Sequence, residues 1–192
     1  MRFKDLKKEL SDLKEIGKGW RGIVYRALWR GKEVAVKVAS RPEVEEAIRK
    51  EAEILKALKG RRGYPQIIFS GEDFIVYRFI KGKTLKEAGL SGEERKKVYR
   101  RVLKMAFELD NLGIKRDEFD YIEKNVILGD DGEVYIIDFD RGKFSERPSN
   151  LTQFLQLLVR EGYLTRKEAI DLGRRYRKDR EGVFYEVLER LK

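Results

Sequence analysis

The segment from residue 119 to residue 140, FDYIEKNVILGDDGEVYIIDFD, has the pattern of two short strands joined by a tight turn. Residues 126–129 and 134–137 are mostly aliphatic or aromatic, and turn-forming residues separate them. If these strands pair, Asn125 and Asp138 lie side by side at the open end of the hairpin, roughly 5 Å apart. An amide oxygen and a carboxylate at this spacing suit Mg²⁺, so the sequence predicts a metal site there.

Cysteine and histidine are both absent from the 192 residues. The lack of cysteine excludes disulfides and thiolate metal sites. The lack of histidine removes the usual zinc ligand and the usual general base at neutral pH. Any acid–base chemistry must use carboxylates, lysine or tyrosine, and any metal must be a hard cation on oxygen ligands.

The chain is strongly basic, with 44 Lys and Arg against 34 Asp and Glu, a formal charge of +10. Charge of this sign and size attracts phosphate backbones in a salt-dependent way. Asn and Gln are scarce while Glu, Lys and Arg are abundant, which is typical of thermophile proteins. No apolar run approaches the ~20 residues of a membrane span, and the N-terminus lacks an apolar secretion signal. We expect a cytoplasmic protein with no membrane partner; the oligomeric state is not indicated.

The hydrophobic pattern predicts an α+β fold with a β-rich N-terminal lobe and a mainly helical C-terminal lobe. The expected division is 1–80 for the first lobe, 81–84 for a connector and 85–192 for the second. In the first lobe we expect helices over 3–16 and 42–60, a β-hairpin from strands 22–29 and 33–38, and two more strands within 65–80 around a turn at 71–73. In the second we expect a long helix from a Ser91–Glu94 capping box to Gly113, the hairpin at 126–137, and two or three helices over 149–192, with a Thr165–Glu168 capping box.

The motif GKGWRG places glycines at positions 17, 19 and 22. A dinucleotide site needs a helix after such a motif, whereas here a predicted β-hairpin follows, with Val24 two residues beyond Gly22. That order is typical of a kinase Gly-rich loop, in which backbone N–H groups approach phosphate oxygens. A glycine turn without a ligand is the alternative for this motif alone.

Lys37 ends the segment EVAVK on the second strand of that hairpin. This segment matches the kinase motif V-A-I-K, whose lysine holds the α- and β-phosphates. Such a lysine needs a carboxylate to orient it. Glu51 is the best candidate, because Ile54 and Leu55 follow it at helical spacing on the face toward the sheet. Other glutamates on the same helix are rivals, namely Glu45, Glu46 and Glu53.

Asp120 precedes Asn125 by five residues, and Asp138 follows the hairpin in the sequence Asp-Phe-Asp. The kinase template is D-x-x-x-x-N, two strands and then D-F-G, with the first Asp as proton acceptor and the other two residues as metal ligands. Arg116-Asp117 resembles the Arg-Asp pair of a kinase catalytic loop, but no Asn lies five residues after Asp117. We therefore reject Asp117 as the catalytic aspartate.

With these motifs in order over residues 16–140, the sequence resembles the protein-kinase-like superfamily. The resemblance implies ATP as co-substrate, with Mg²⁺ or Mn²⁺ as the metal. It also implies a hinge at IVYRFIKG, with Tyr77 as gatekeeper and the backbone of Arg78 and Ile80 against adenine.

Several departures narrow the resemblance to reduced kinases. The position two after Asp120, usually Lys, is Ile122, and Lys124 is the candidate to take over the role of that lysine. D-F-G is replaced by D-F-D, which ends in Asp140. No A-P-E is present, and the chain after Asp140 is too short for a peptide-docking region. Of the RIO kinases, the Bud32 kinases and the archaeal RNA kinase family (ArkI), the sequence most resembles the last. That family phosphorylates the ribose 2′-hydroxyl of a variable-loop uridine, at tRNA position 47.

Three basic clusters favour tRNA as the partner: 59–62, 95–101 and 174–180. Tyr64, Tyr99 and Tyr176 lie within or beside them and are expected to stack on bases. A solvated surface of ion pairs is the alternative for any one cluster. An atypical Ser/Thr protein kinase and a non-catalytic, nucleotide-sensing RNA-binding module remain alternative functions. The residues expected to bind RNA are Arg174, Arg175, Arg177, Lys178 and Arg180.

Overall fold

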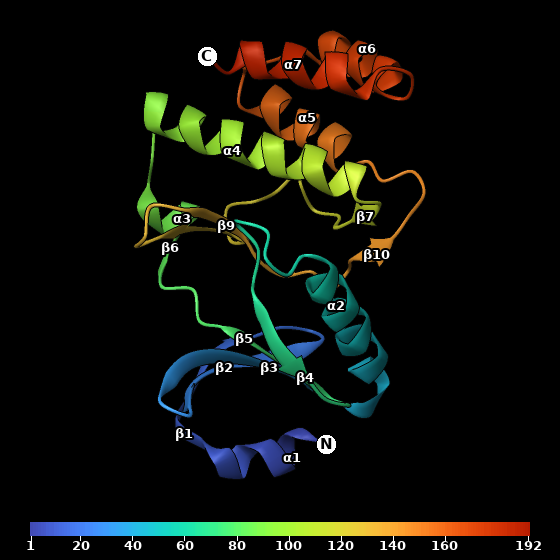
Figure 1. Cartoon of the computed structure of the whole chain (residues 1–192). Coiled ribbons are helices and arrows are strands. Elements are labelled where there is room, and N and C mark those ends of the chain that lie inside the picture. The colour runs from blue at the N-terminus through green and yellow to red at the C-terminus, as the bar shows by residue number, and fades with distance from the viewer. The chain divides into compact units, whose positions relative to one another are not determined.

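The computed structural model describes residues 1–192, which form two compact units (Figure 1). The first unit contains residues 1–82 and 129–143, and the second contains residues 83–128 and 144–192. The sequence placed the connector at 81–84, close to the passage from the first unit to the second. The contacts additionally group residues 129–143 with the N-terminal sheet, although they follow the connector in the chain.

The first unit is built on a five-stranded sheet of order β1-β2-β3-β5-β4, in which all neighbours are antiparallel. Alternating apolar residues on one face form its core, which includes Val34, Val36, Phe74 and Val76. The predicted hairpin and the later pair of strands are confirmed. The strands are β1 (Leu10–Lys18), β2 (Gly22–Trp29), β3 (Lys32–Ala39), β4 (Ile67–Ser70) and β5 (Phe74–Arg78).

The predicted helix over residues 3–16 is wrong. Only α1 (Phe3–Leu6) and a 3₁₀ turn (Lys7–Glu9) are helical, and the chain then enters β1. Pairing with β2 extends the sheet and overrides local helical propensity. Leu10 and Leu13 still pack against the sheet core, because a bulge after Ser11, with Asp12 at φ +51°, shifts the register between them.

The predicted helix after Pro42 is confirmed. A 3₁₀ turn (Pro42–Val44) leads into α2 (Glu45–Ala57), and Gly60, with φ +83°, follows its end. The buried face of α2 carries Ile48, Glu51, Ala52, Ile54 and Leu55 and packs on β3, β4 and β5.

Residues 129–143 are tied to the first unit through backbone hydrogen bonds. The Gly129 N–H donates to the Glu133 carbonyl over 2.8 Å and closes the predicted four-residue turn between β8 (Val126–Gly129) and β9 (Val134–Ile136). The Ile136 N–H donates to the Gly63 carbonyl at the same distance. β9 ends one residue earlier than expected, because the chain turns sharply at Asp138 with φ +69°.

The second unit is mainly helical. Its helices α4, α5, α6 and α7 pack in succession, with α5 between α4 and the α6–α7 pair (Figure 1). Two or three C-terminal helices were expected after residue 149, and the structure has three. The helices are α3 (Leu85–Ala88), α4 (Gly92–Asn111), α5 (Asn150–Arg160), α6 (Arg166–Tyr176) and α7 (Arg180–Arg190); short strands are β6 (Gly82–Thr84), β7 (Ile114–Lys115) and β10 (Lys143–Phe144).

The two predicted capping boxes differ in outcome. Thr165 accepts the Glu168 N–H and Glu168 caps Thr165 in return, as expected. Ser91 forms no such bond, because Gly92 at φ +55° departs from helical geometry in the first turn of α4. The chain thus has the predicted α+β class, and none of its helices has the length and apolarity to cross a bilayer.

Candidate active site

Lys37 is the centre of a buried ion network in the first unit. Its Nζ lies 2.8 Å from Glu51 Oε2 and 3.2 Å from Asp138 Oδ1. The side chains of Lys37 and Glu51 are only 9% and 4% exposed, while that of Asp138 is 38% exposed. The lysine therefore links a buried carboxylate on α2 to one that solvent or a ligand can reach.

Glu51 was expected to be the partner of Lys37, and the structure places it there. It lies three residues after Ile48 and four before Leu55, so the buried face of α2 carries it toward β3. The rival glutamates pair elsewhere on the surface, Glu45 with Arg2, Glu46 with Lys50 and Glu53 with Lys56.

Asp138 begins a tight turn whose backbone is fixed by the same network. The Phe139 N–H donates to Glu51 Oε1 over 3.1 Å, and the Asp140 N–H donates to Asp138 Oδ1 over 3.2 Å. The Phe139 ring is buried edge-on against Tyr64. A non-glycine residue at positive φ costs of order 1 kcal/mol or more, and such strain is concentrated at functional sites.

The electrostatics of this turn are dominated by burial and by adjacent carboxylates. Burial alone would lower the pKa of Lys37, but the charges of Glu51 and Asp138 more than offset it and raise that pKa. Burial and then the charge of Asp138 raise the pKa of Asp140 to about 6, although Lys37 opposes the shift. Lys37 is therefore a fixed cation, and the Asp-Phe-Asp turn concentrates negative charge beside it.

In the second unit, Asp120 and Asn125 lie on a loop that is anchored at several points. The Phe119 ring is buried, and its N–H donates to Gln153 Oε1 over 3.3 Å. The Arg160 side chain donates to the backbone carbonyl of Asp120 over 2.5 Å, so this bond does not use the Asp120 carboxylate. The Asn125 N–H donates to the Ile122 carbonyl over 3.1 Å. Both polar side chains are partly exposed on a loop of fixed backbone.

Comparison with known proteins decides the family. The family model for phosphotransferase enzymes (APH) matches residues 12–119, more than half of the chain. The chain belongs to the phosphotransferase enzyme family. The matched residues include Gly17, Lys37 and Glu51, whereas Asp120, Asn125 and Asp138 lie beyond them.

Two relatives are consistent with this family. A Bacillus subtilis protein, YrzF, named as a candidate serine/threonine-protein kinase, is 37% identical over 83 residues, which cover 43% of this chain and 38% of that protein. An uncharacterised protein of Methanocaldococcus jannaschii is 33% identical over 99 residues, which cover 50% of this chain and 84% of that protein. The chain thus spans well under half the length of the Bacillus protein.

The Gly-rich loop joins β1 to β2, and its glycines differ in what they do. A Cβ on Gly22 would lie 2.8 Å from the Val38 carbonyl, so β3 requires a glycine there. A Cβ on Gly17 or Gly19 would meet nothing nearer than 3.9 Å. Strand packing therefore does not explain these two glycines, and the lack of a side chain leaves the backbone there open to close approach by a ligand. Arg21 ties the loop to the Asp140 carbonyl.

A divalent cation fits the residues present in the first unit. Asp138 and Asp140 are neighbouring carboxylates, and burial, followed by the repulsion from Asp138, raises the pKa of Asp140. A cation near Asp138 Oδ1 and Oδ2 would relieve that repulsion, and hard cations with phosphate ligands need only one or two protein oxygens. The protein has no cluster of three or more acidic, His or Cys side chains arranged as a metal site.

Ile122 occupies the position at which protein kinases usually carry lysine. Its side chain is 1% exposed, so it anchors the loop by packing and has no access to a substrate. Lys124, two residues on, is exposed. Arg116, in the rejected Arg-Asp pair, is buried and donates to the Asp117 carbonyl over 2.9 Å, which is a structural use of its charge.

The connector residues have defined backbone partners. The Arg78 N–H donates to the Gln66 carbonyl over 3.0 Å, so this donor is already used. Burial raises the pKa of Tyr77, the expected gatekeeper, which lies opposite Ala35 of β3. Val24 lies opposite Lys37 on the neighbouring strand.

The expectation that Tyr64, Tyr99 and Tyr176 stack on bases is wrong, because all three rings are buried in the protein core. Two basic clusters are also largely neutralised. Arg95 pairs with Glu123 and Glu161, Arg100 pairs with Glu93, and Arg62 pairs with Glu133. The alternative of an ion-paired surface therefore describes these two clusters better.

Sequence reasoning missed a buried polar network that joins three helices of the second unit. Asp110, at the end of α4, accepts hydrogen bonds from the Asn150 and Leu151 backbone, the Asn150 side chain and the Tyr176 hydroxyl. Burial raises the pKa of Asp110, and these donors oppose the shift. The one sequence signal for this network is Asp110 itself, an acidic residue near the end of the apolar face of a long helix.

Proposed function

We propose that the protein is an ATP-dependent kinase that phosphorylates a ribose 2′-hydroxyl of tRNA. The observation that carries the kinase assignment is Lys37 held 2.8 Å from Glu51 and 3.2 Å from Asp138. Kinases require this lysine–glutamate pair and a metal-binding aspartate in place together. Membership of the phosphotransferase enzyme family supports the assignment independently.

The residues of the first unit bind and orient ATP. The buried cation of Lys37 pairs with the α- and β-phosphates, and the Gly-rich loop between β1 and β2 lets the phosphates approach its backbone closely, although the Gly19 N–H itself donates to the Gly22 carbonyl. The Arg78 carbonyl and the Ile80 N–H bind adenine, since the Arg78 N–H is occupied. Asn125 and Asp138 are the residues that would hold Mg²⁺ or Mn²⁺, and the bound ion would supply positive charge to the phosphates.

Asp120 takes the acceptor's proton. The 2′-oxygen forms a bond to the γ-phosphorus as the bond from that phosphorus to the β–γ bridging oxygen breaks, ADP departs with the electron pair, and the hydroxyl proton goes to the Asp120 carboxylate. The anchored backbone of residues 117–125 holds this carboxylate in position. Catalysis comes from positioning and charge neutralisation, as in other phosphoryl transfers.

RNA as the acceptor is supported by the net charge of +10 and by the resemblance to the archaeal RNA kinase family. A serine/threonine protein kinase is the second candidate, favoured by the name of the Bacillus relative. A nucleotide-sensing RNA-binding module with no transfer activity is the third.

The test is transfer of label from γ-labelled ATP with Mg²⁺ to either total tRNA or a protein extract. Label in tRNA, recovered after nuclease digestion on a 2′-phosphate and lost in Asp120→Asn, supports the proposal. The Asn variant keeps the backbone bond to Arg160 and should bind ATP and unfold as the wild type does. Label in protein alone identifies the second candidate, and ATP binding with no transfer identifies the third.

A further inference from the structure

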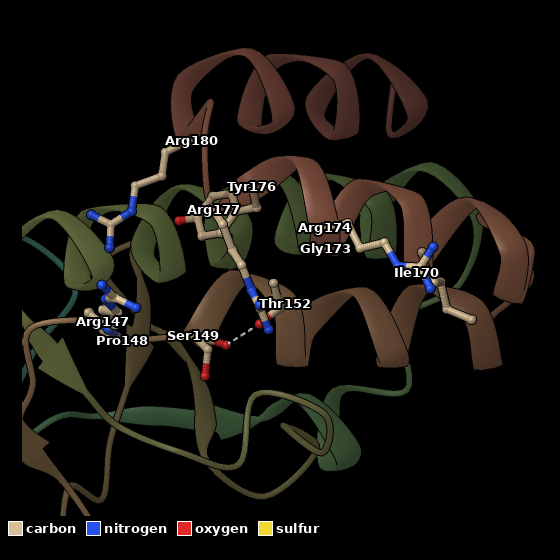
Figure 2. Close-up of a pocket in the computed structure, with 11 residues that line it drawn as sticks. Arg147, Pro148, Ser149, Thr152, Ile170, Gly173, Arg174, Tyr176, Arg177 and Arg180 are labelled. Carbon is tan, nitrogen blue, oxygen red and sulfur yellow. Dashed lines mark hydrogen bonds between the residues drawn. The ribbon is translucent and has the colours of Figure 1, made fainter.

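A cavity of about 750 Å³ lies in the second unit against α5, α6 and the loop before α5 (Figure 2). Four arginines line it, together with the hydroxyl residues Ser149 and Thr152. We call this the arginine cavity; its arginines are Arg147, Arg174, Arg177 and Arg180. Arg147 was not among the residues expected to bind RNA.

The arginine cavity carries positive charge that the protein does not neutralise. None of its four arginines has a carboxylate within 4.0 Å, although ion pairs are frequent elsewhere on the surface. Arg175, on the same helix, pairs with Asp171 and Glu186 and does not line the cavity. Unpaired guanidinium groups that line one cavity repel one another, and a bound anion reduces that repulsion.

The nearby acidic groups are already used. Asp179 caps α7 by accepting the Gly182 N–H over 2.9 Å, and Asp171 pairs with Arg175. Asp110 faces α5 and the Tyr176 hydroxyl, and only its backbone carbonyl accepts a bond from Arg180, over 3.3 Å. An anion in the cavity would thus meet donors rather than carboxylates.

The geometry of α6 directs two arginines into the cavity. Arg174 and Arg177 are three residues apart and share a helix face. In Figure 2, Arg177 extends toward Ser149 and Thr152, whose own hydrogen bond runs from the Thr152 hydroxyl to the Ser149 carbonyl over 2.9 Å. The Ser149 hydroxyl, at the N-cap of α5, makes no capping bond.

A buried hydrogen-bond network ties together the elements that form the cavity walls. The Tyr176 hydroxyl donates to Asp110 Oδ2 over 2.6 Å, and Asp110 also holds the start of α5. This joins the two helices that carry the cavity walls. Guanidinium groups on a fixed frame bind phosphate oxygens in a bidentate manner with little loss of entropy.

We propose that the arginine cavity binds backbone phosphates of the RNA acceptor, which rests on the RNA acceptor proposed above. The volume exceeds the needs of one phosphate, and the four arginines are spread along the cavity rather than gathered at one point (Figure 2). Its one aromatic residue, Tyr176, is buried, so the cavity offers no surface for base stacking. It fixes the position of the RNA without reading its sequence.

The test compares two double variants of the full chain, each of which removes two positive charges from α6. Arg174→Gln with Arg177→Gln alters the cavity. Arg166→Gln with Lys167→Gln is the matched control, since both residues are exposed, unpaired and outside the cavity. The probe is total tRNA, with binding measured between about 50 and 300 mM salt and folding checked by circular dichroism.

Each lost phosphate contact lowers the salt slope by about 0.7–0.9 and affinity about five- to eight-fold at 0.1 M salt. The cavity variant should therefore bind tRNA on the order of 25- to 60-fold more weakly, and the control less than about three-fold. Equal losses in both variants, or no loss in the cavity variant, would overturn the proposal. Binding of inorganic phosphate or of an acidic peptide by a chain that ignores tRNA would do the same.

Kinase activity separates this proposal from the previous one. If the wild type labels tRNA, the cavity variant should raise the KM for tRNA and leave the KM for ATP unchanged. If the wild type labels no RNA but the cavity variant still loses tRNA binding selectively, the kinase proposal fails and the cavity stands. If the wild type labels tRNA but the cavity variant has an unchanged KM for tRNA, the proposal for the cavity fails and the kinase proposal stands.

Discussion

Replacing the buried ion pair of the first unit should give strongly non-additive changes in stability. The variants are Lys37→Met, Glu51→Gln and the two combined. Met removes the only cation between Glu51 and Asp138, whereas Gln removes the charge of Glu51 and keeps an oxygen that can accept the Phe139 N–H.

The magnitudes follow from burial. Lys37→Met leaves a 4%-exposed carboxylate without its cation, and removing one partner of a buried pair costs about 3–5 kcal/mol. Glu51→Gln costs about 1–3 kcal/mol, because Lys37 keeps Asp138 at 3.2 Å. The double variant contains no buried unpaired charge, so we expect a cost of only about 1–2 kcal/mol. It should therefore be more stable than Lys37→Met by about 2 kcal/mol.

Denaturant unfolding of the full chain measures these values. Both tryptophans, Trp20 and Trp29, belong to the first unit, and Trp29 packs against Phe69 of its sheet. Tryptophan fluorescence therefore reports the first unit, while circular dichroism at the helix band reports mainly α4–α7.

The reasoning is refuted if the double variant loses at least the sum of the single losses. That result would mean that Lys37 and Glu51 stabilise the fold by packing alone, and that the ion pair carries no coupling energy. A change confined to the helical signal would also contradict it, because the pair lies wholly in the first unit.

Two further predictions concern single sites. Gly22→Ala should destabilise the first unit by about 1–3 kcal/mol in the same fluorescence assay, whereas Gly19→Ala should leave stability unchanged and weaken ATP binding measured by calorimetry; equal stability losses would contradict the distinction. Asp110→Asn should cost about 2–3 kcal/mol, because the amide places a donor against donors. Since the folded-state pKa of Asp110 is raised, its contribution to stability is complete below its unfolded value of 3.8 and is lost as the pH rises through the folded value. The difference in free energy of unfolding between wild type and Asp110→Asn should therefore become smaller as the pH rises from about 4 to 7. Unfolding followed by circular dichroism at the helix band measures it, and a difference that grows with pH would refute the reasoning.

The parts of the fold that follow local patterns were predictable. Periodicity located α2 and distinguished Glu51 from its neighbours, because a helix face can be counted from the sequence. Turn residues located the boundary between β8 and β9, and Thr165 and Glu168 located the start of α6.

What failed depends on partners distant in the sequence. Residues 10–18 form a strand because β2 is available to pair with them, which their own helical spacing does not show. Tyrosines beside arginines in the sequence suggest an RNA-binding surface, but the rings of Tyr64, Tyr99 and Tyr176 are buried by packing, which the local sequence does not show. Arg147 was missed because only folding brings it to the α6 arginines, 27 or more residues away in the chain. The roles of Asp120, Asn125 and Asp138 stay predictions.

The first unit includes residues 129–143, which the chain reaches only after α3 and α4. During synthesis, the N-terminal sheet can emerge early, but the turn that supplies Asp138 to Lys37 is added some hundred residues after the lysine. Until then Lys37 and Glu51 have only each other, so a nascent or prematurely terminated chain keeps the lysine–glutamate pair yet lacks the acidic turn. The ribosome thus delivers a chain that acquires its full charge arrangement late, when the helices of the second unit are already being made.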